Sequence, residues 1–364
     1  MADPKAEGTN HASNLKTLTT IASNSFVEEN LDTPGILFFE HINMQVGSKN
    51  ITRIFYQDIL GMTPDPSPSF HYNIGQQQFH FMLAKNGEAS HVVCGCIGIS
   101  VPSLERVLFA CKEVGQRLLL KTQFQILHIE EDFISIKGPY GNTFHIYQIG
   151  LRGNLGDESD DENETFMEKK HKMWDNGMTV RGQPGIKFIE WQVVNTKSVA
   201  SFYQKYFGCN VYNHTHHCDK GKSVEQAVVQ VGADVHFVFT ENSHMNKMPV
   251  DLQRGIHVCV YVSAFKRSYH SLLSDRMIWT NPKFVGLDRC DTWEDAKAGR
   301  QYRFKDFLDP KSNTIFFELE HEVRSARHYQ YLKRISYVPF VLDVNKNYTV
   351  NTNDSTEQST PSLL

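Results

Sequence analysis

Histidines inside apolar, strand-like runs are the residues of this chain best suited to chemistry. They occur together with a cysteine and a glutamate in similar runs: His41, His80, Cys96, His145, His236, His257 and Glu318. Imidazole nitrogens, thiolates and carboxylate oxygens are the common protein ligands of zinc and iron. A histidine that alternates with apolar residues on a strand is also commonly a hydrogen-bonded core residue, so residue type alone leaves both roles open.

The composition indicates a soluble globular protein with room for two domains. The chain has 364 residues, of which 40% are hydrophobic and 21% charged. Its formal net charge is −4, so there is no global basic field to attract nucleic acid or an anionic membrane. No apolar run approaches the roughly 18 residues that a membrane-spanning helix needs.

The ends of the chain and its cysteines favour a cytoplasmic protein. The first 33 residues are polar, lack the apolar core of a secretory signal, and carry too many acidic residues for a transit peptide. The seven cysteines are odd in number and scattered, and several lie in apolar strand-like runs. We therefore expect reduced thiols rather than a disulfide framework.

Three polar segments divide the chain into two blocks. Residues 1–33 and 341–364 read as disordered tails, and residues 151–183, which contain GDESDDENE, read as an acidic linker. The two blocks between them, residues 34–150 and 184–340, are the predicted domains.

The two blocks repeat each other. PGILFFE at Pro34 returns as PGIKFIE at Pro184, and the same order of shorter matches follows in both blocks. These matches are FYQ at Phe55 and Phe202, HF at His80 and His236, and NT at Asn142 and Asn313. Four matches in one order indicate an internal duplication.

Each block also divides into two halves with the order strand, helix, strand, strand and, in places, a further strand. In the first half, Ile51, Ile54, Phe55 and Ile59 share one helical face, and Gly61 follows as a stop. Residues 322–336 predict a trailing helix after the last strand. Residues 213–221, NHTHHCDKG, predict a solvated turn.

These motifs resemble the vicinal oxygen chelate superfamily, which includes glyoxalases, bleomycin-resistance proteins and extradiol dioxygenases. HINMQV with FYQDILGM resembles the opening strand and helix of that family, and CIGISVPSLERV resembles the opening of its second half. GPYGNTFHIY and DPKSNTIFFELE resemble its closing strand. The resemblance covers most of both blocks. It implies an α+β fold of two tandem domains, each made of paired βαβββ units that form a curved mixed sheet.

In this family, metal ligands come from the first and fourth strands of paired units. In block one the matching positions are His41, His80, Cys96 and His145, and the resemblance implies that these four side chains converge on one ion. His145 departs from the usual closing glutamate, and Cys96 stands where the family commonly has histidine. A set of three imidazoles and a thiol would favour zinc.

In block two the matching positions are Trp191, His236, His257 and either Phe316 or Glu318. Trp191 is not a metal ligand. Glu318 would reach the site through a β-bulge, and with His236 and His257 it would form the two-histidine, one-carboxylate set that suits iron. The alternative is a degenerate domain whose role is packing against block one.

Three functions follow as hypotheses. The first is a zinc- or iron-dependent lyase, isomerase or dioxygenase acting on a small oxygen-chelating substrate. The second is a metal-free protein that binds a small molecule by apolar and aromatic contacts. The third is a scaffold in which the fold persists without a working site. We expect a small-molecule ligand, no nucleic-acid or membrane partner, and pairing of the two domains within one chain or in a homodimer.

Overall fold

The computed structural model describes three stretches of the chain. They are residues 35–149 (without 67, 86, 87 and 132), 183–242 (without 219–221 and 234) and 254–332 (without 284, 285 and 287). The predicted tails and linker lie outside these residues. None of the helices in the described stretches has the length and apolar character needed to cross a membrane.

Block one folds into two successive units with the same element order. Unit 1 contains β1 (Ile36–Val46), α2 (Lys49–Arg53) with π-helix η1 (Ile54–Ile59), β2 (Thr63–Pro64), β3 (His71–Ile74) and β4 (Gln77–Leu83). Unit 2 contains β5 (Cys96–Val101), α3 (Leu104–Ala110) with η2 (Cys111–Gly115) and α4 (Gln116–Leu118), β6 (Gln125–Ile129), β7 (Phe133–Lys137) and β8 (Thr143–Gln148). Both units therefore have the order βαβββ.

Block two repeats this order with one strand reduced. Unit 3 contains β9 (Gly185–Val193), α6 (Thr196–Phe207), β10 (Val211–Cys218), β11 (Lys222–Gln230) and β12 (His236–Glu241). Unit 4 contains β13 (His257–Val262), α7 (Phe265–Ser274), α8 (Trp293–Gly299), β14 (Gln301–Leu308) and β15 (Ile315–Ser325). A single bridge between Ile278 and Phe304 stands where the other units have a strand.

The helices begin and end at residues with clear local causes. The Ser48 hydroxyl accepts a hydrogen bond from the Ile51 amide and caps α2. Gly61, at φ +76°, follows the end of η1 as predicted. In unit 3, the Asn195 side chain caps the start of α6, and Gly208 in the left-handed region ends it.

The units pair across the two blocks, not within them. Sheet A has the order β14-β15-β13-β1-β4-β3-β2 and joins unit 4 to unit 1. Sheet B has the order β10-β11-β12-β9-β5-β8-β7-β6 and joins unit 3 to unit 2. In each sheet the first strands of the two units meet as an antiparallel pair, β1 with β13 and β5 with β9. The two blocks are therefore joined within one chain, which is one of the two pairing modes expected from the sequence.

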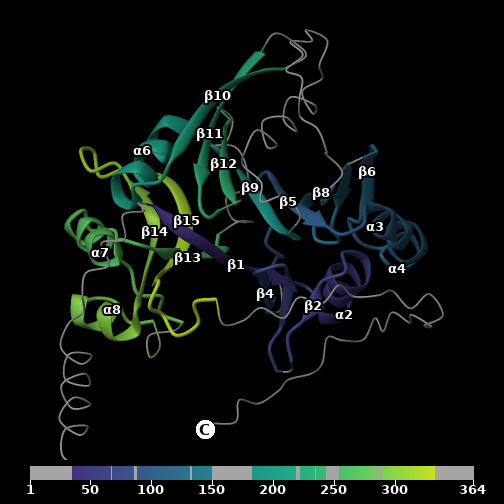
Figure 1. Ribbon diagram of the computed structural model, residues 1–364, viewed down its shortest axis with the longest axis horizontal. Helices are drawn as coiled ribbons and strands as arrows, with labels where there is room; N and C mark the ends of the chain where they lie inside the picture. The colour runs from purple at the N-terminus through teal and green to yellow at the C-terminus, as the bar shows by residue number, and fades with distance from the viewer. Residues whose placement is uncertain are drawn as a thin grey trace, which may run out of the picture.

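Aromatic contacts also join the two units of each block, within one apolar core that includes residues of both blocks. Phe55 and Phe144 join units 1 and 2, with ring centroids 5.2 Å apart, and Phe202 and Phe307 join units 3 and 4 at 4.1 Å. In Figure 1, α2, α3 and α4 of block one lie on one side of the molecule and α6, α7 and α8 of block two on the other, with β1, β5 and β9 between them. The mixed α+β fold with two curved sheets confirms the predicted fold class.

Two local predictions were wrong. Residues 322–325 continue strand β15, and the described residues after it form turns, so no helix begins at residue 322. Pairing with β13 and β14 decides this, because it satisfies the backbone of these residues on both sides. Residues 213–218 belong to β10, which pairs with β11, and are not a solvated turn.

We predict that Gly75→Ala destabilises the fold. Gly75 lies in the turn between β3 and β4 at φ +57°, and an added Cβ would lie 1.8 Å from the backbone oxygen of Pro184, just before β9. The substitution would push sheet A from the start of sheet B, so we expect a loss of at least about 2 kcal/mol in the free energy of unfolding. Urea denaturation measures this. Gly286→Ala is the control, because nothing lies within 4 Å of its added Cβ, and equal stability of both variants would contradict the prediction.

Candidate metal centre

A group of polar side chains faces the concave side of sheet A, opposite the apolar core. On β1, Phe39, Met44 and Val46 point into the core, while His41 and Asn43 point the other way. On β15, Phe317, Leu319, His321 and Val323 are buried in the core, and the intervening positions carry charge: Glu318, Glu320, Glu322 and Arg324. The alternation of the two strands therefore collects polar side chains on one face.

Three potential metal ligands converge at the middle of this face, from three strands of two units. The Nε2 atoms of His41 on β1 and His257 on β13 are 3.4 Å apart. The Nε2 atom of His257 is 3.8 Å from Oε2 of Glu322 on β15. One ligand atom from each of the three residues lies within 4.8 Å of the other two, and all three residues are buried. We call these three residues the sheet A site.

Two further histidines extend the site toward the edge of the sheet. The ring of His80 stacks on that of His41 with centroids 3.8 Å apart and an interplanar angle of 17°. The ring of His71 stacks on the other side of His80 at 3.6 Å and 10°. His80 also shares a 2.8 Å hydrogen bond with the Gln78 side chain. The ring of His80, one of the predicted ligands, thus packs against the face of the His41 ring.

A buried ion network surrounds the carboxylate of the site. Arg303 binds Glu322 and Glu320 and also pairs with Asp288. Arg324 binds Glu322 and Glu40. The two guanidinium groups therefore hold both oxygens of the Glu322 carboxylate.

The protonation states suit metal ligation. Burial disfavours the charge of Glu322, but Arg303 and Arg324 hold the pKa of this carboxyl far below its usual range. Burial, together with the nearby Arg303 and His41, lowers the pKa of His257 well below its usual value. Near neutral pH the site therefore presents a carboxylate and a neutral imidazole, the forms that bind metals.

The structure separates the four ligands predicted for block one. His41 and His80 lie in sheet A, whereas Cys96 and His145 lie in sheet B, on β5 and β8. The predicted convergence of all four is therefore wrong. Its cause is the pairing of units 1 and 4 and of units 2 and 3, which the order of motifs along the chain does not determine.

The predicted set of block two is separated for the same reason. His257 lies in sheet A, and His236 lies on β12 in sheet B, opposite Phe188. Glu318 shares the strand and face of Glu322 but lies four residues before it, a quarter exposed, and pairs with Arg254 and Lys305. Glu318 is thus outside the sheet A site. The carboxylate next to His257 belongs to Glu322, and the predicted bulge at Glu318 is not needed to bring it there.

Cys96 and His145 have neighbours of their own in sheet B. The Cys96 thiol donates to Glu190 Oε2 at 3.0 Å, and its sulfur lies 3.7 Å from Nδ1 of His145. Glu190 also accepts a 2.6 Å hydrogen bond from Thr240. Trp191, which follows Glu190 at the position equivalent to His41, is fully buried. Sheet B therefore differs chemically from sheet A at the matching positions.

The sequence reading missed Glu322, Glu40 and the two arginines. The signal for Glu322 was present, because charged residues alternate with apolar ones from Glu318 to Arg324, as on a strand with one polar face. The pattern was not recognised because a helix was predicted to begin at residue 322. No comparable sequence signal marks Glu40, whose direction depends on a bulge.

In each sheet two βαβββ-type units meet at their first strands, and their first and last strands bring side chains to the middle of one concave face. This is the arrangement that the sequence motifs implied. The chain has the vicinal oxygen chelate fold.

Comparison with solved structures finds similarities at low sequence identity. Glyoxalase I from Zea mays is 12% identical with a TM-score of 0.47, covering 80% of this chain and 92% of that one. A putative dioxygenase from Bacillus subtilis is 10% identical with a TM-score of 0.44, covering 84% and 92%. An extradiol ring-cleaving dioxygenase from B. fuscum is 12% identical with a TM-score of 0.25, covering 83% and 75%. No protein-family model and no curated protein sequence matches the chain, and similarities at this level say nothing about activity.

We predict that His236→Gln flattens the pH dependence of stability. Burial and the nearby Lys187 lower the pKa of His236 to about 4. Between pH 6.5 and pH 4 the unfolded chain takes up a proton at this residue and the folded protein does not, so acid favours unfolding. At pH 5 this amounts to about 2 kcal/mol relative to pH 7.5. Urea denaturation at both pH values should show a smaller difference for the variant, and the same difference in both proteins would contradict the prediction.

Proposed function

We propose that this protein is a metal-dependent enzyme in which the sheet A site holds one divalent transition metal ion. The observation that carries the proposal is the convergence of His41, His257 and Glu322 from three strands. Two ligands that each lie about 2.0–2.1 Å from a tetrahedral ion are roughly 3.4 Å apart. The 3.4 Å and 3.8 Å separations found here are close to this value.

The donor types favour zinc or iron over magnesium. Two imidazoles and one carboxylate form the set typical of non-haem iron and of catalytic zinc sites, whereas magnesium prefers oxygen ligands. Three protein ligands also leave coordination positions for a substrate. A bound ion of this kind would act as a Lewis acid on a substrate oxygen.

The residues around the site hold the ligands and present polar groups to a substrate. The arginines fix the Glu322 carboxylate, and the stack with His80 fixes the ring of His41. Asn43 lies two residues after His41 on the same face, and its buried Oδ1 has no hydrogen-bond partner. A hydroxyl or amide donor on a ligand would satisfy this oxygen.

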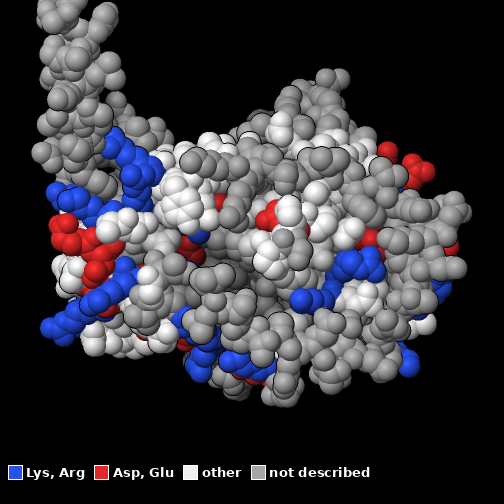
Figure 2. Space-filling view, turned by 90° about the horizontal axis from the view of Figure 1, so that it is seen from below, with Lys and Arg blue, Asp and Glu red and all other residues white. Residues whose placement is uncertain are grey.

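These features favour a small substrate with neighbouring oxygens, one of which donates a hydrogen bond. Figure 2 shows a hollow near the middle of one face of the molecule, with acidic and basic atoms along part of its wall. Among the described residues, Lys and Arg as well as Asp and Glu lie on this face. Lyase, isomerase and dioxygenase reactions are all compatible with such a site, in a soluble protein of the cytoplasm.

One observation favours a metal-free binding protein as the second candidate. Arg303 and Arg324 both bind Glu322, so its oxygens already have charged partners. A guanidinium group can thus take the place of a cation in balancing this carboxylate. In that case the concave face of sheet A would bind a small polar ligand through the amide and imidazole side chains of unit 1.

We predict that the purified protein binds one Co²⁺ ion per chain at the sheet A site. Co²⁺ serves as a coloured probe for zinc or iron, and its visible absorption reports on coordination. His41→Ala, His257→Ala and Glu322→Gln should each weaken binding by more than the roughly 10–100-fold that loss of an outer-shell partner costs. The control is His236→Gln, a buried histidine of sheet B, which should bind Co²⁺ like the unaltered protein.

Two results would decide against a metal centre. One is a content below about 0.2 metal ions per chain after purification without chelators, together with no tight Co²⁺ binding. The other is binding that survives all three substitutions, because the ion would then lie elsewhere. A folded protein with the first result supports the metal-free candidate.

A further inference from the structure

Glu40 and His41 are consecutive residues of a strand and yet face the same side. Side chains normally alternate along a strand, so neighbours point to opposite faces. The pairing of β1 with β13 shifts register between Phe39 and His41, where Phe39 pairs with Val260 and His41 with Cys259. This bulge brings both Glu40 and His41 to the concave face, where both are buried.

The carboxylate of Glu40 is held in place by three neighbours. Arg324 Nη1 donates to Glu40 Oε2 at 2.5 Å, the Tyr261 hydroxyl donates at 3.2 Å, and the Cys259 thiol at 3.4 Å. The guanidinium group of Arg324 forms an ion pair with this carboxylate and so stabilises its charged form. Glu40 is therefore a fixed negative charge beside the sheet A site.

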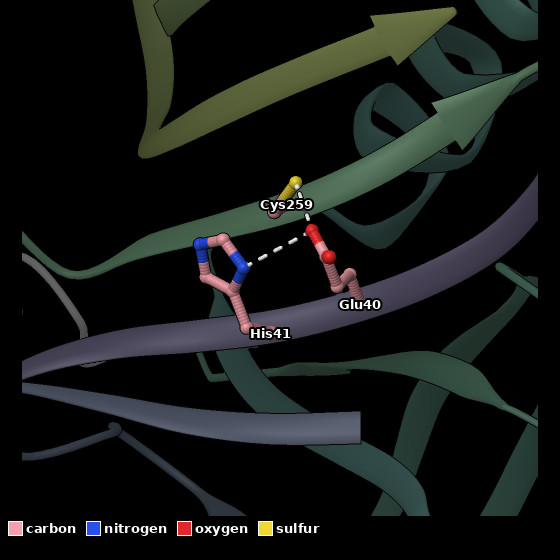
Figure 3. A group of neighbouring side chains, drawn as sticks. All are labelled: Glu40, His41 and Cys259. Carbon is pink, nitrogen blue, oxygen red and sulfur yellow. Dashed lines mark hydrogen bonds and ion pairs between the residues drawn. The ribbon is translucent and has the colours of Figure 1, made fainter. Parts of the chain in front are cut away.

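The same oxygen lies beside the ring nitrogen of His41 that faces away from the site. Oε2 of Glu40 is 3.4 Å from Nδ1 of His41, as Figure 3 shows together with the contact to Cys259. The Nδ1 atom is buried and makes no hydrogen bond. On the other side of the ring, Nε2 points toward His257 Nε2. A carboxylate at Nδ1 favours the tautomer with its proton there, which leaves the lone pair on Nε2.

We propose that Glu40 is a positioning residue that sets the tautomer of His41 and directs its Nε2 lone pair to the metal. The inference rests on the proposed metal site and adds to it a residue that does not touch the ion. A small rotation of the His41 ring would turn the 3.4 Å contact into a hydrogen bond. The stack with His80 fixes the plane of the ring, and Glu40 fixes which nitrogen carries the proton.

Sheet B contains a natural comparison for this arrangement. There Glu190 accepts a hydrogen bond from Cys96 of the neighbouring first strand, as Glu40 does from Cys259. The residue after Glu190 is Trp191, so no histidine follows the glutamate of sheet B along its strand. The glutamate–cysteine pair itself is therefore common to both sheets, and only in sheet A does a histidine follow the glutamate.

The test combines the tautomer of His41 with metal affinity. In the full chain labelled with ¹⁵N-histidine and free of metal, long-range ¹H–¹⁵N spectra show which ring nitrogen carries the proton, with His41→Gln identifying the signal. We expect the Nδ1–H form in the unaltered protein and a loss of that preference in Glu40→Gln and Glu40→Ala. Co²⁺ affinity should fall about 10-fold or more in both variants, in the range known for outer-shell partners.

Two matched controls separate this role from packing and from charge. Glu190→Gln removes the equivalent carboxylate of sheet B. Glu320→Gln removes a carboxyl group of the same ion network, which binds Arg303 and Asn281 rather than His41. Both should keep the His41 tautomer and bind Co²⁺ within about 2-fold of the unaltered protein, and urea denaturation shows that each variant is folded.

The outcomes distinguish this inference from the proposed function. An Nε2–H tautomer in the unaltered protein, an unchanged tautomer in both Glu40 variants, or an equal loss of Co²⁺ affinity in Glu320→Gln would overturn the role of Glu40. If no variant binds Co²⁺, the unaltered protein included, the proposed function fails, and the tautomer measurement still decides whether Glu40 orients His41.

Discussion

The antiparallel pairing of first strands across the two blocks is the constraint on which the rest of the structure depends. Pairing of β1 with β13 brings His41 of block one within 3.4 Å of His257 of block two. Apolar contacts also join the units of one block, such as that of Phe55 with Phe144, and others join the two blocks, such as that of Phe39 with Phe237. Neither block can therefore form the sheet A site alone, and the site depends on both halves of the chain being in place.

Buried charge follows from this geometry. A concave face at the junction of two units is closed off from water, so the carboxylates on it need partners. Arg303 and Arg324 supply them from β14 and β15, the two strands at the block-two end of sheet A. Removal of one partner from such a network leaves a buried charge without compensation. For this reason the network fixes the positions of Glu40 and Glu322 more firmly than single hydrogen bonds would.

The sequence predicted the units well and their pairing poorly. The spacing of apolar residues and the positions of helix-ending residues are local properties of the sequence. They were enough to predict the helix α2–η1, its end before Gly61 and the repeat of the βαβββ order. Pairing between units joins residues far apart in the sequence, and the motifs are compatible with pairing within a block and with pairing across the two blocks. His41 and His257 were both recognised as possible ligands, but in different sites.

Glu322 and Glu40 show two kinds of limit on prediction. Glu322 lies in a stretch with charge at alternate positions, but the same residues suit a polar helix, and sheet pairing with β13 decides between the two. Glu40 precedes a histidine on a strand, and ordinary alternation would send it into the core. Only the register shift opposite Val260 and Cys259 turns it to the concave face, and a bulge of this kind leaves no mark in residue types.

The two sheets share one backbone plan and differ in a few side chains at its centre. In sheet A a histidine follows the central glutamate and shares its face, whereas in sheet B the residue that follows, Trp191, is buried in the apolar core. An indole has no lone pair for a metal ion, so this position of sheet B has no counterpart to the imidazole of His41. The proposed metal site therefore depends on the convergence of three donors in sheet A, next to a carboxylate that a bulge brings to the same face.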